Sequence, residues 1–115
     1  MNVKIYHNPR CGKSRQTLQL LQEQGIEPEI IEYLKTPPSA LELDDILKKL
    51  GMEPRELMRK KEAEYKAGGL DDTSLDRQAL ITAMVNNPIL IERPIVIASG
   101  KAAVGRPPEA VLVIL

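Results

Sequence analysis

The sequence is short of the residues that build cross-linked or metal-bound proteins. It has one cysteine and one histidine in 115 residues. A lone cysteine cannot close a disulfide within the chain, so nothing in the sequence indicates a secreted, cross-linked scaffold. One cysteine and one histidine are also too few ligands for a closed zinc site. We therefore expect a free thiol and no metal.

The sequence also lacks the features of nucleic-acid and membrane proteins. The 16 basic residues are matched by 16 acidic ones, so there is no basic excess to bind a nucleic acid. With three tyrosines and no Phe or Trp, base stacking is not expected. No apolar run could span a bilayer, and the N-terminus becomes polar too early for a secretory signal. We expect a cytoplasmic protein without nucleic-acid or membrane partners.

The first half of the chain has the pattern of a strand-helix-strand unit followed by a helix. The length favours a single domain over residues 1–115. Alternation predicts strands at Val3–Tyr6 and Glu29–Leu34, and the helix between them ends at Gly25. The next helix begins after Ser39 and ends at Gly51.

The second half predicts more helix and then a hairpin. One helix is expected over residues 54–69, and another has Ser74 as its N-cap. Strands at Ile95–Ala98 and Ala102–Val104 form a hairpin, and a last helix follows the paired prolines. This order predicts an α/β protein with a mixed four-stranded sheet and a helical insertion, which by analogy is the thioredoxin-like order.

The only cysteine lies in a positively charged turn, in the stretch "YHNPRCGKSR". Cys11 follows a strand and stands at the start of a helix, where free backbone N–H groups and the helix dipole favour a thiolate and bind anions. Arg10, Lys13 and Arg15 add positive charge, and His7 does so when protonated. We expect a lowered pKa for Cys11. The alternative is a small buried hydrophobe, which suits the polar surroundings less well.

The residue three positions after the cysteine decides how a redox cycle could finish. Dithiol oxidoreductases place their second cysteine there, whereas this chain has Ser14. The serine could equally serve only the start of the helix. Without a second cysteine an outside thiol must complete any redox reaction, either glutathione or a partner redoxin. A C-x5-R phosphatase loop is excluded, because Thr17 stands where its arginine is needed.

Four blocks of the sequence resemble the glutaredoxin-coupled arsenate reductases. They are "YHNPRCGKSRQTL", "ELMRKKE", "NNPILIERPIVI" and "GRPPEAVL", in the family's order and over nearly the whole chain. The resemblance implies a thioredoxin-like fold with a helical insertion. It also implies that a cysteine thiolate attacks arsenate, that glutathione acts as co-substrate, and that glutaredoxin is the partner that completes reduction to arsenite, with no bound cofactor.

The resemblance assigns roles to residues at matching positions. Cys11 would be the nucleophile, His7 would help to keep it charged, and Ser14 would hydrogen-bond to it. Pro94 would be the cis proline beside the active cysteine. Three arginines match the family's oxyanion-binding arginines: Arg59, Arg93 and Arg106. Guanidinium forks suit this task, because they bind tetrahedral oxyanions through paired, charge-assisted hydrogen bonds.

Other functions stay open at this point. The chain could be a glutathione-dependent thiol reductase with another substrate, or a redox-responsive regulator of the same fold. The regulators use a C-x-x-C switch, and Ser14 removes its second cysteine. A protein disulfide would not need three guanidinium groups, which favours arsenate. Taken singly, each arginine could be a solvated surface cation, as we expect of Arg55 and Arg77.

Overall fold

The computed structural model describes residues 2–115, which fall into two compact units. The sheet unit comprises residues 2–36 together with Arg93–Leu115, and the helical unit is Pro37–Glu92. The single domain expected over 1–115 stays a prediction. Within residues 2–115, no helix is long and apolar enough to cross a membrane, and no group of His, Cys, Asp and Glu side chains could hold a metal ion.

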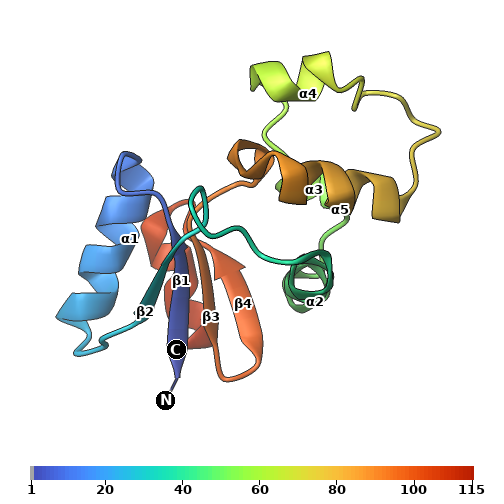
Figure 1. Cartoon of the computed structure of the whole chain (residues 1–115). Coiled ribbons are helices and arrows are strands. Elements are labelled where there is room, and N and C mark those ends of the chain that lie inside the picture. The colour runs from blue at the N-terminus through green and yellow to red at the C-terminus, as the bar shows by residue number, and fades with distance from the viewer. Residues whose placement is uncertain (1) are drawn as a thin grey trace. The chain divides into compact units, whose positions relative to one another are not determined.

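The sheet unit contains the predicted mixed four-stranded sheet. The strands are β1 (Val3–His7), β2 (Glu29–Glu32), β3 (Ile95–Ala98) and β4 (Lys101–Val104). Their order is β2-β1-β3-β4; β1 and β2 are parallel, and the other two pairs are antiparallel (Figure 1). The fold class predicted from the sequence is thus confirmed, although the second strand ends two residues earlier than expected.

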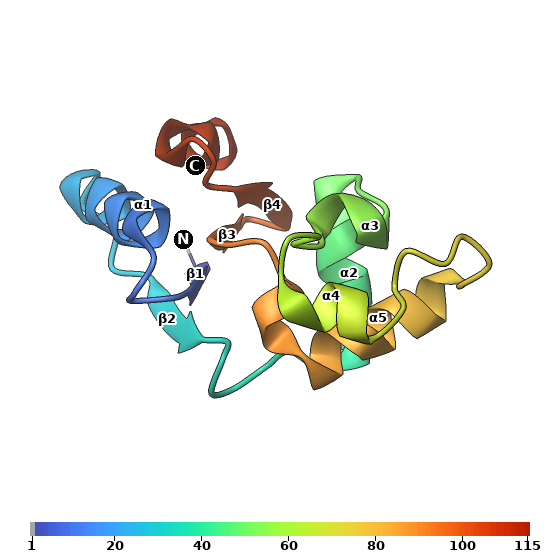
Figure 2. The ribbon, with the colours of Figure 1, turned by 90° about the horizontal axis from the view of Figure 1, so that it is seen from above.

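Two helical segments cover one face of this sheet. Helix α1 (Gly12–Glu23) and the 3-10 helix η2 (Pro108–Ile114) lie on the same side of the strands (Figure 2). The expected last helix is therefore 3-10 rather than α, in a segment rich in β-branched residues, which have lower α-helix propensity. The buried core of the unit is formed by Val3, Ile5, Leu21, Val96, Ala98, Val111 and Ile114.

The helical unit begins with the helix that the capping residues predicted. Helix α2 (Ala40–Leu50) starts at Ser39, whose Oγ accepts a hydrogen bond from the Glu42 N–H, and ends at Gly51 in the left-handed conformation. Leu41 has the helical spacing of a buried residue, but it is 81% exposed. The buried face is formed instead by Leu43, Ile46 and Leu47.

The single helix expected over residues 54–69 is wrong, because it is split into two short helices. These are α3 (Pro54–Leu57) and α4 (Ala63–Ala67). Between them Met58 forms a β-bridge with Ile91, and the Arg59 N–H donates to the Leu90 carbonyl over 2.7 Å. Pairing with a distant segment therefore overrides the helical propensity of this stretch.

The last helix of this unit begins later than predicted. Helix α5 (Arg77–Asn86) is capped by Asp76, whose Oδ1 accepts from the Ala79 N–H over 2.8 Å, and it is followed by the 3-10 helix η1 (Pro88–Leu90). Ser74 is not the N-cap. Its N–H and hydroxyl both donate to Asp72 Oδ1, which places it in the turn before the helix.

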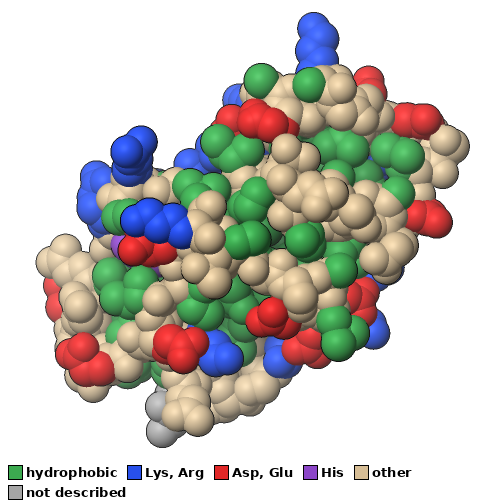
Figure 3. Space-filling view, in the orientation of Figure 1, with side chains coloured by type: hydrophobic (Ala, Val, Ile, Leu, Met, Phe, Trp, Pro, Cys, Tyr) green, Lys and Arg blue, Asp and Glu red, His purple; other side chains and the backbone are tan. Residues whose placement is uncertain are grey.

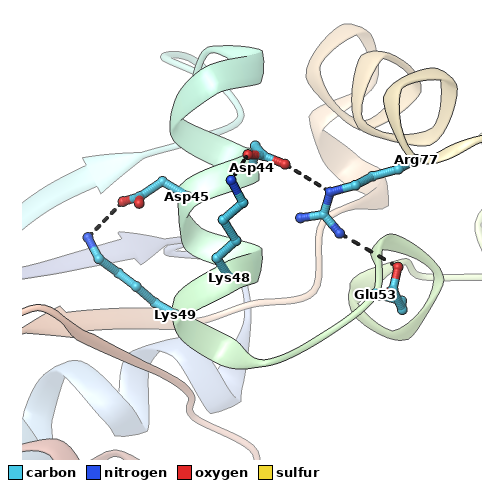
Figure 4. A network of polar contacts seen from close by, with 6 residues as sticks. All are labelled: Asp44, Asp45, Lys48, Lys49, Glu53 and Arg77. Atoms are coloured by element: carbon cyan, nitrogen blue, oxygen red, sulfur yellow. Dashed lines mark hydrogen bonds and ion pairs between the residues drawn. The ribbon is translucent and has the colours of Figure 1, made fainter.

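Arg55 and Arg77 are not the solvated cations that the sequence led us to expect. Arg77 Nε lies 2.9 Å from Asp44 Oδ1, and its Nη1 lies 3.6 Å from Glu53 Oε2, so it links α2 to the start of α3 (Figure 4). The hydrogen bonds from Arg77 and from Lys48 hold the pKa of Asp44 below its usual value. Arg55 donates to the backbone carbonyls of residues 70 and 72. Both arginines therefore stabilise the helical unit internally.

Candidate active site

Cys11 is the N-cap residue of α1 and lies at the end of a tight turn. Its N–H donates to the Asn8 carbonyl, and its own carbonyl accepts from the Arg15 N–H, both over 3.0 Å. Cys11 has extended φ and ψ angles, which is the usual conformation of an N-cap residue. The thiol is free, and the residue is only 8% exposed. The turn therefore points a nearly buried thiol at the open N–H groups of the helix.

The electrostatic surroundings favour the thiolate form of Cys11. Burial raises the pKa of the Cys11 thiol, but this effect is outweighed by the Ser14 backbone N–H, the Arg93 charge, the Lys13 backbone N–H and the Arg106 charge. The pKa therefore lies below its ordinary value, as expected from the position at a helix start.

Arg93 and Arg106 are brought together at the start of β3. Arg106 Nε donates to the Arg93 carbonyl over 3.0 Å, and the Gly105 N–H donates to the Pro94 carbonyl over 2.9 Å. Arg93 is buried, and the peptide bond between Arg93 and Pro94 is cis, as the resemblance implied for Pro94. Two guanidinium groups that flank the β3–β4 hairpin, far from Cys11 in sequence, thus lower the pKa of its thiol.

The cations next to Cys11 in the sequence lie at the protein surface. Arg10, Lys13 and Arg15 are all exposed. The side-chain charges that lower the pKa of Cys11 are those of Arg93 and Arg106, and Lys13 contributes through its backbone N–H. In the space-filling view, Lys and Arg side chains gather over the part of the sheet unit that holds the β1–α1 loop (Figure 3). The nearest charges in sequence are therefore surface charges.

His7 and Ser14 form a buried pair behind the loop. His7 Nδ1 lies 2.6 Å from Ser14 Oγ, and Ser14 Oγ also accepts from the Asn8 N–H over 3.0 Å. Burial lowers the pKa of His7, Glu32 opposes this, and Arg15 adds to it, so the ring is mainly neutral at pH 7. The neutral imidazole thus shares a hydrogen bond with the Ser14 hydroxyl. The Ser14 hydroxyl contacts His7 and Asn8, and its backbone N–H serves the thiol.

The third predicted arginine belongs to the helical unit. Arg59 follows the β-bridge residue Met58 and is one-quarter exposed. Its Nη1 lies 2.7 Å from Glu62 Oε1, and its Nε lies 3.9 Å from Glu92 Oε1. Two carboxylates of its own unit therefore accompany this guanidinium group.

The sequence matches one known family over nearly its whole length, from residue 6 to residue 114. The chain belongs to the ArsC family. It is 63% identical over 114 residues to the uncharacterized protein YfgD of Escherichia coli K12, and the aligned region covers 98% of this chain and 96% of that protein. It is 54% identical over 114 residues to the arsenate reductase of Neisseria meningitidis Z2491, and the aligned region covers 98% of this chain and 97% of that protein. A solved structure of an arsenate reductase from Vibrio cholerae is 54% identical, with a TM-score of 0.98 over 100% of this chain and 98% of that one. The resemblance found in the sequence is thus confirmed.

In this ArsC protein, two further residues shape the site and were not predicted as part of it. Thr17 is fully buried on α1, and its Oγ1 donates to the Lys13 carbonyl over 2.8 Å. A Cβ atom built on Gly105 would lie 2.5 Å from Thr17 Oγ1 and 2.8 Å from Pro94 Cγ. Gly105 is therefore needed for the close approach of the segment that carries Arg106. No local pattern reveals this, because "VGRPP" has only the signature of a turn.

The lowered pKa of Cys11 predicts rapid alkylation at neutral pH. A larger thiolate fraction at pH 7 should make the folded protein react with iodoacetamide faster than the same chain unfolded in urea. The measurement is the rate of alkylation against pH, and the folded protein should reach its half-maximal rate at a lower pH. Coincident profiles for the folded and unfolded chains would contradict the lowered pKa.

Proposed function

We propose that this protein reduces arsenate to arsenite through Cys11, with glutathione as co-substrate and glutaredoxin as partner. The observation that carries the proposal is a nearly buried thiol at a helix start, whose pKa is lowered by the Ser14 backbone N–H and by the charges of Arg93 and Arg106. Two guanidinium charges beside a thiolate suit an anionic substrate that the thiolate attacks. The arsenate reductases among the relatives support arsenate as that substrate.

In the first step the Cys11 sulfur bonds to arsenic and displaces one oxygen. The thiol and hydrogen arsenate form a thioester of arsenate, and the displaced oxygen leaves as water. Arg93 and Arg106 would balance the charge on the remaining oxygens, together with the N–H groups at the start of α1. Arg59 joins this set on the resemblance alone. The pair formed by His7 and Ser14 would hold the loop that presents the thiol.

The reduction itself needs thiols from outside the chain, since Cys11 is the only cysteine. Two thiol groups supply two electrons, arsenic goes from the +5 to the +3 state, and the thiols leave as a disulfide. The overall change converts arsenic acid and two thiols into arsenous acid, one disulfide and one water. Glutathione and glutaredoxin supply these thiols in our proposal, which agrees with a cytoplasmic location.

A coupled assay tests this proposal. Purified protein with arsenate, glutathione, glutaredoxin, glutathione reductase and NADPH should oxidise NADPH at a rate proportional to the protein. Omission of glutathione or of glutaredoxin should remove this rate. A parallel mixture with thioredoxin and its reductase in their place should give little turnover, because no second cysteine is present to form the disulfide that thioredoxin reduces.

The assay also separates the alternatives. Turnover with thioredoxin alone would contradict the glutathione coupling and leave arsenate reduction in place. No arsenate-dependent turnover in either mixture would contradict arsenate as the substrate. In that case, reduction of a mixed disulfide between glutathione and a small thiol would favour the thiol reductase with another substrate.

A further inference from the structure

Arg15 is held over the loop that carries Cys11. It lies in the first turn of α1, and its Nη1 donates to the Pro9 carbonyl over 2.9 Å. A Cβ atom built on Gly12, the residue after Cys11, would lie 3.8 Å from Arg15 Nη2. The guanidinium group thus folds back beside the Pro9–Gly12 turn, although the residue is exposed to solvent.

The charge of Arg15 is not neutralised by an acid. Its side-chain partner is a backbone carbonyl, and no carboxylate within residues 2–115 forms an ion pair with it. Arg59 and Arg77, in contrast, each have two carboxylates. A fixed, exposed guanidinium group beside the turn that carries a reactive thiol is suited to bind a carboxylate of an incoming reactant.

We propose that Arg15 is the docking residue for a carboxylate of the glutathione molecule that reacts at Cys11. This proposal shares one premise with the proposed function, namely that glutathione reacts at Cys11. Glutathione has two carboxylates and one ammonium group, so it carries a net negative charge at neutral pH. Arg15 would bind one carboxylate through its fork while the sulfur approaches Cys11. Exposed Arg10 and Lys13 give the same surface a positive field, which increases the rate of encounter.

The same docking should operate when Cys11 reacts with oxidised glutathione, which makes a direct test possible without arsenate. The Cys11 thiolate attacks one sulfur of the disulfide, a new S–S bond joins Cys11 to glutathione, and the second glutathione leaves as a thiolate. Three disulfides undergo the same exchange reaction but differ in net charge. Glutathione disulfide carries a net charge of about −2, hydroxyethyl disulfide is neutral, and cystamine is a dication at neutral pH.

The test compares wild type with Arg15→Gln on these three probes. We expect the rate with glutathione disulfide to fall about fivefold, the factor that corresponds to about 1 kcal/mol for unit charges about 4 Å apart in water. The rate with hydroxyethyl disulfide should stay unchanged, and that with cystamine should rise. Neutral iodoacetamide checks that the thiolate itself is unaltered. The measurement is the second-order rate constant for loss of the free thiol.

A matched control removes the same charge elsewhere in the same unit. Lys101 is exposed and pairs with Ala98, which in turn pairs with Val3. It therefore lies at the end of the sheet where β1 begins, whereas Cys11 follows the opposite end of β1. Lys101→Gln should leave all three rates unchanged. Equal losses with charged and neutral disulfides in Arg15→Gln would overturn the proposal, because they would mean that Arg15 only supports the loop.

Wild-type protein provides a second measurement, independent of any variant. Added salt should lower the rate with glutathione disulfide relative to that with hydroxyethyl disulfide, because screening weakens contacts between exposed charges. A ratio that stays constant with salt would also overturn the proposal. Failure of arsenate turnover would leave both measurements valid, so the two proposals fail separately.

Discussion

Replacement of Cys11 by serine should abolish arsenate-dependent oxidation of NADPH to the level of the blank. The serine hydroxyl keeps its proton at neutral pH, whereas the surroundings of Cys11 lower its pKa and supply a thiolate. A hydroxyl group is also unable to form the sulfur–arsenic bond or the mixed disulfide with glutathione. The measurement is the coupled assay with glutathione and glutaredoxin present in excess, so that the protein limits the rate.

This substitution should leave the fold intact, which makes the loss interpretable. Serine is slightly smaller than cysteine, and its hydroxyl can accept hydrogen bonds from the backbone N–H groups of Lys13 and Ser14 that serve the thiol. The thermal unfolding midpoint should therefore stay close to that of wild type. Retained turnover in a folded Cys11→Ser protein would show that arsenate is reduced elsewhere, and the proposed nucleophile would be wrong.

The sheet and the thiol loop could be predicted because their signals are local. The strands alternate in polarity and contain β-branched residues. Ser39 caps the start of a helix and Gly51 ends it, and the turn around Cys11 has a proline before the cysteine and a glycine after it. Each of these features acts within a few residues. The placement of Cys11 at the N-terminus of α1 follows from them without any long-range contact.

The helical unit was predicted less well because distant pairing decides it. The stretch around Met58 has good helix formers, yet its backbone pairs with the segment around Ile91. Arg77 was taken for a surface cation because its partners, Asp44 and Glu53, lie far away in sequence. The lowered pKa of His7 was also not predictable, since burial of a side chain is a tertiary property.

Gly105 shows the same limit within the site, and it predicts a large effect on stability. Gly105→Ala places a Cβ atom 2.5 Å from Thr17 Oγ1 and 2.8 Å from Pro94 Cγ, distances at which α1 or the start of β3 must move. Overpacking of this kind typically costs about 1–3 kcal/mol of folding free energy. The Gly105 N–H donates to the Pro94 carbonyl, and Arg106 Nε donates to the Arg93 carbonyl. The same shift should therefore displace both arginines. Denaturant unfolding measures the first effect, and the coupled assay measures the second.

Gly12→Ala is the matched control, because a Cβ atom there meets only Arg15 Nη2, at 3.8 Å. This replacement of a glycine at the start of α1 should change the free energy of unfolding by less than about 1 kcal/mol. A double-mutant cycle with Thr17→Ala assigns the clash: the alanine lacks the two Thr17 atoms that Gly105→Ala would meet, so the double variant should be more stable than the sum of the single losses predicts. Contact with Pro94 remains, so recovery should be partial. Strict additivity would mean that Thr17 does not press on Gly105, and that α1 is not what fixes the segment carrying Arg106.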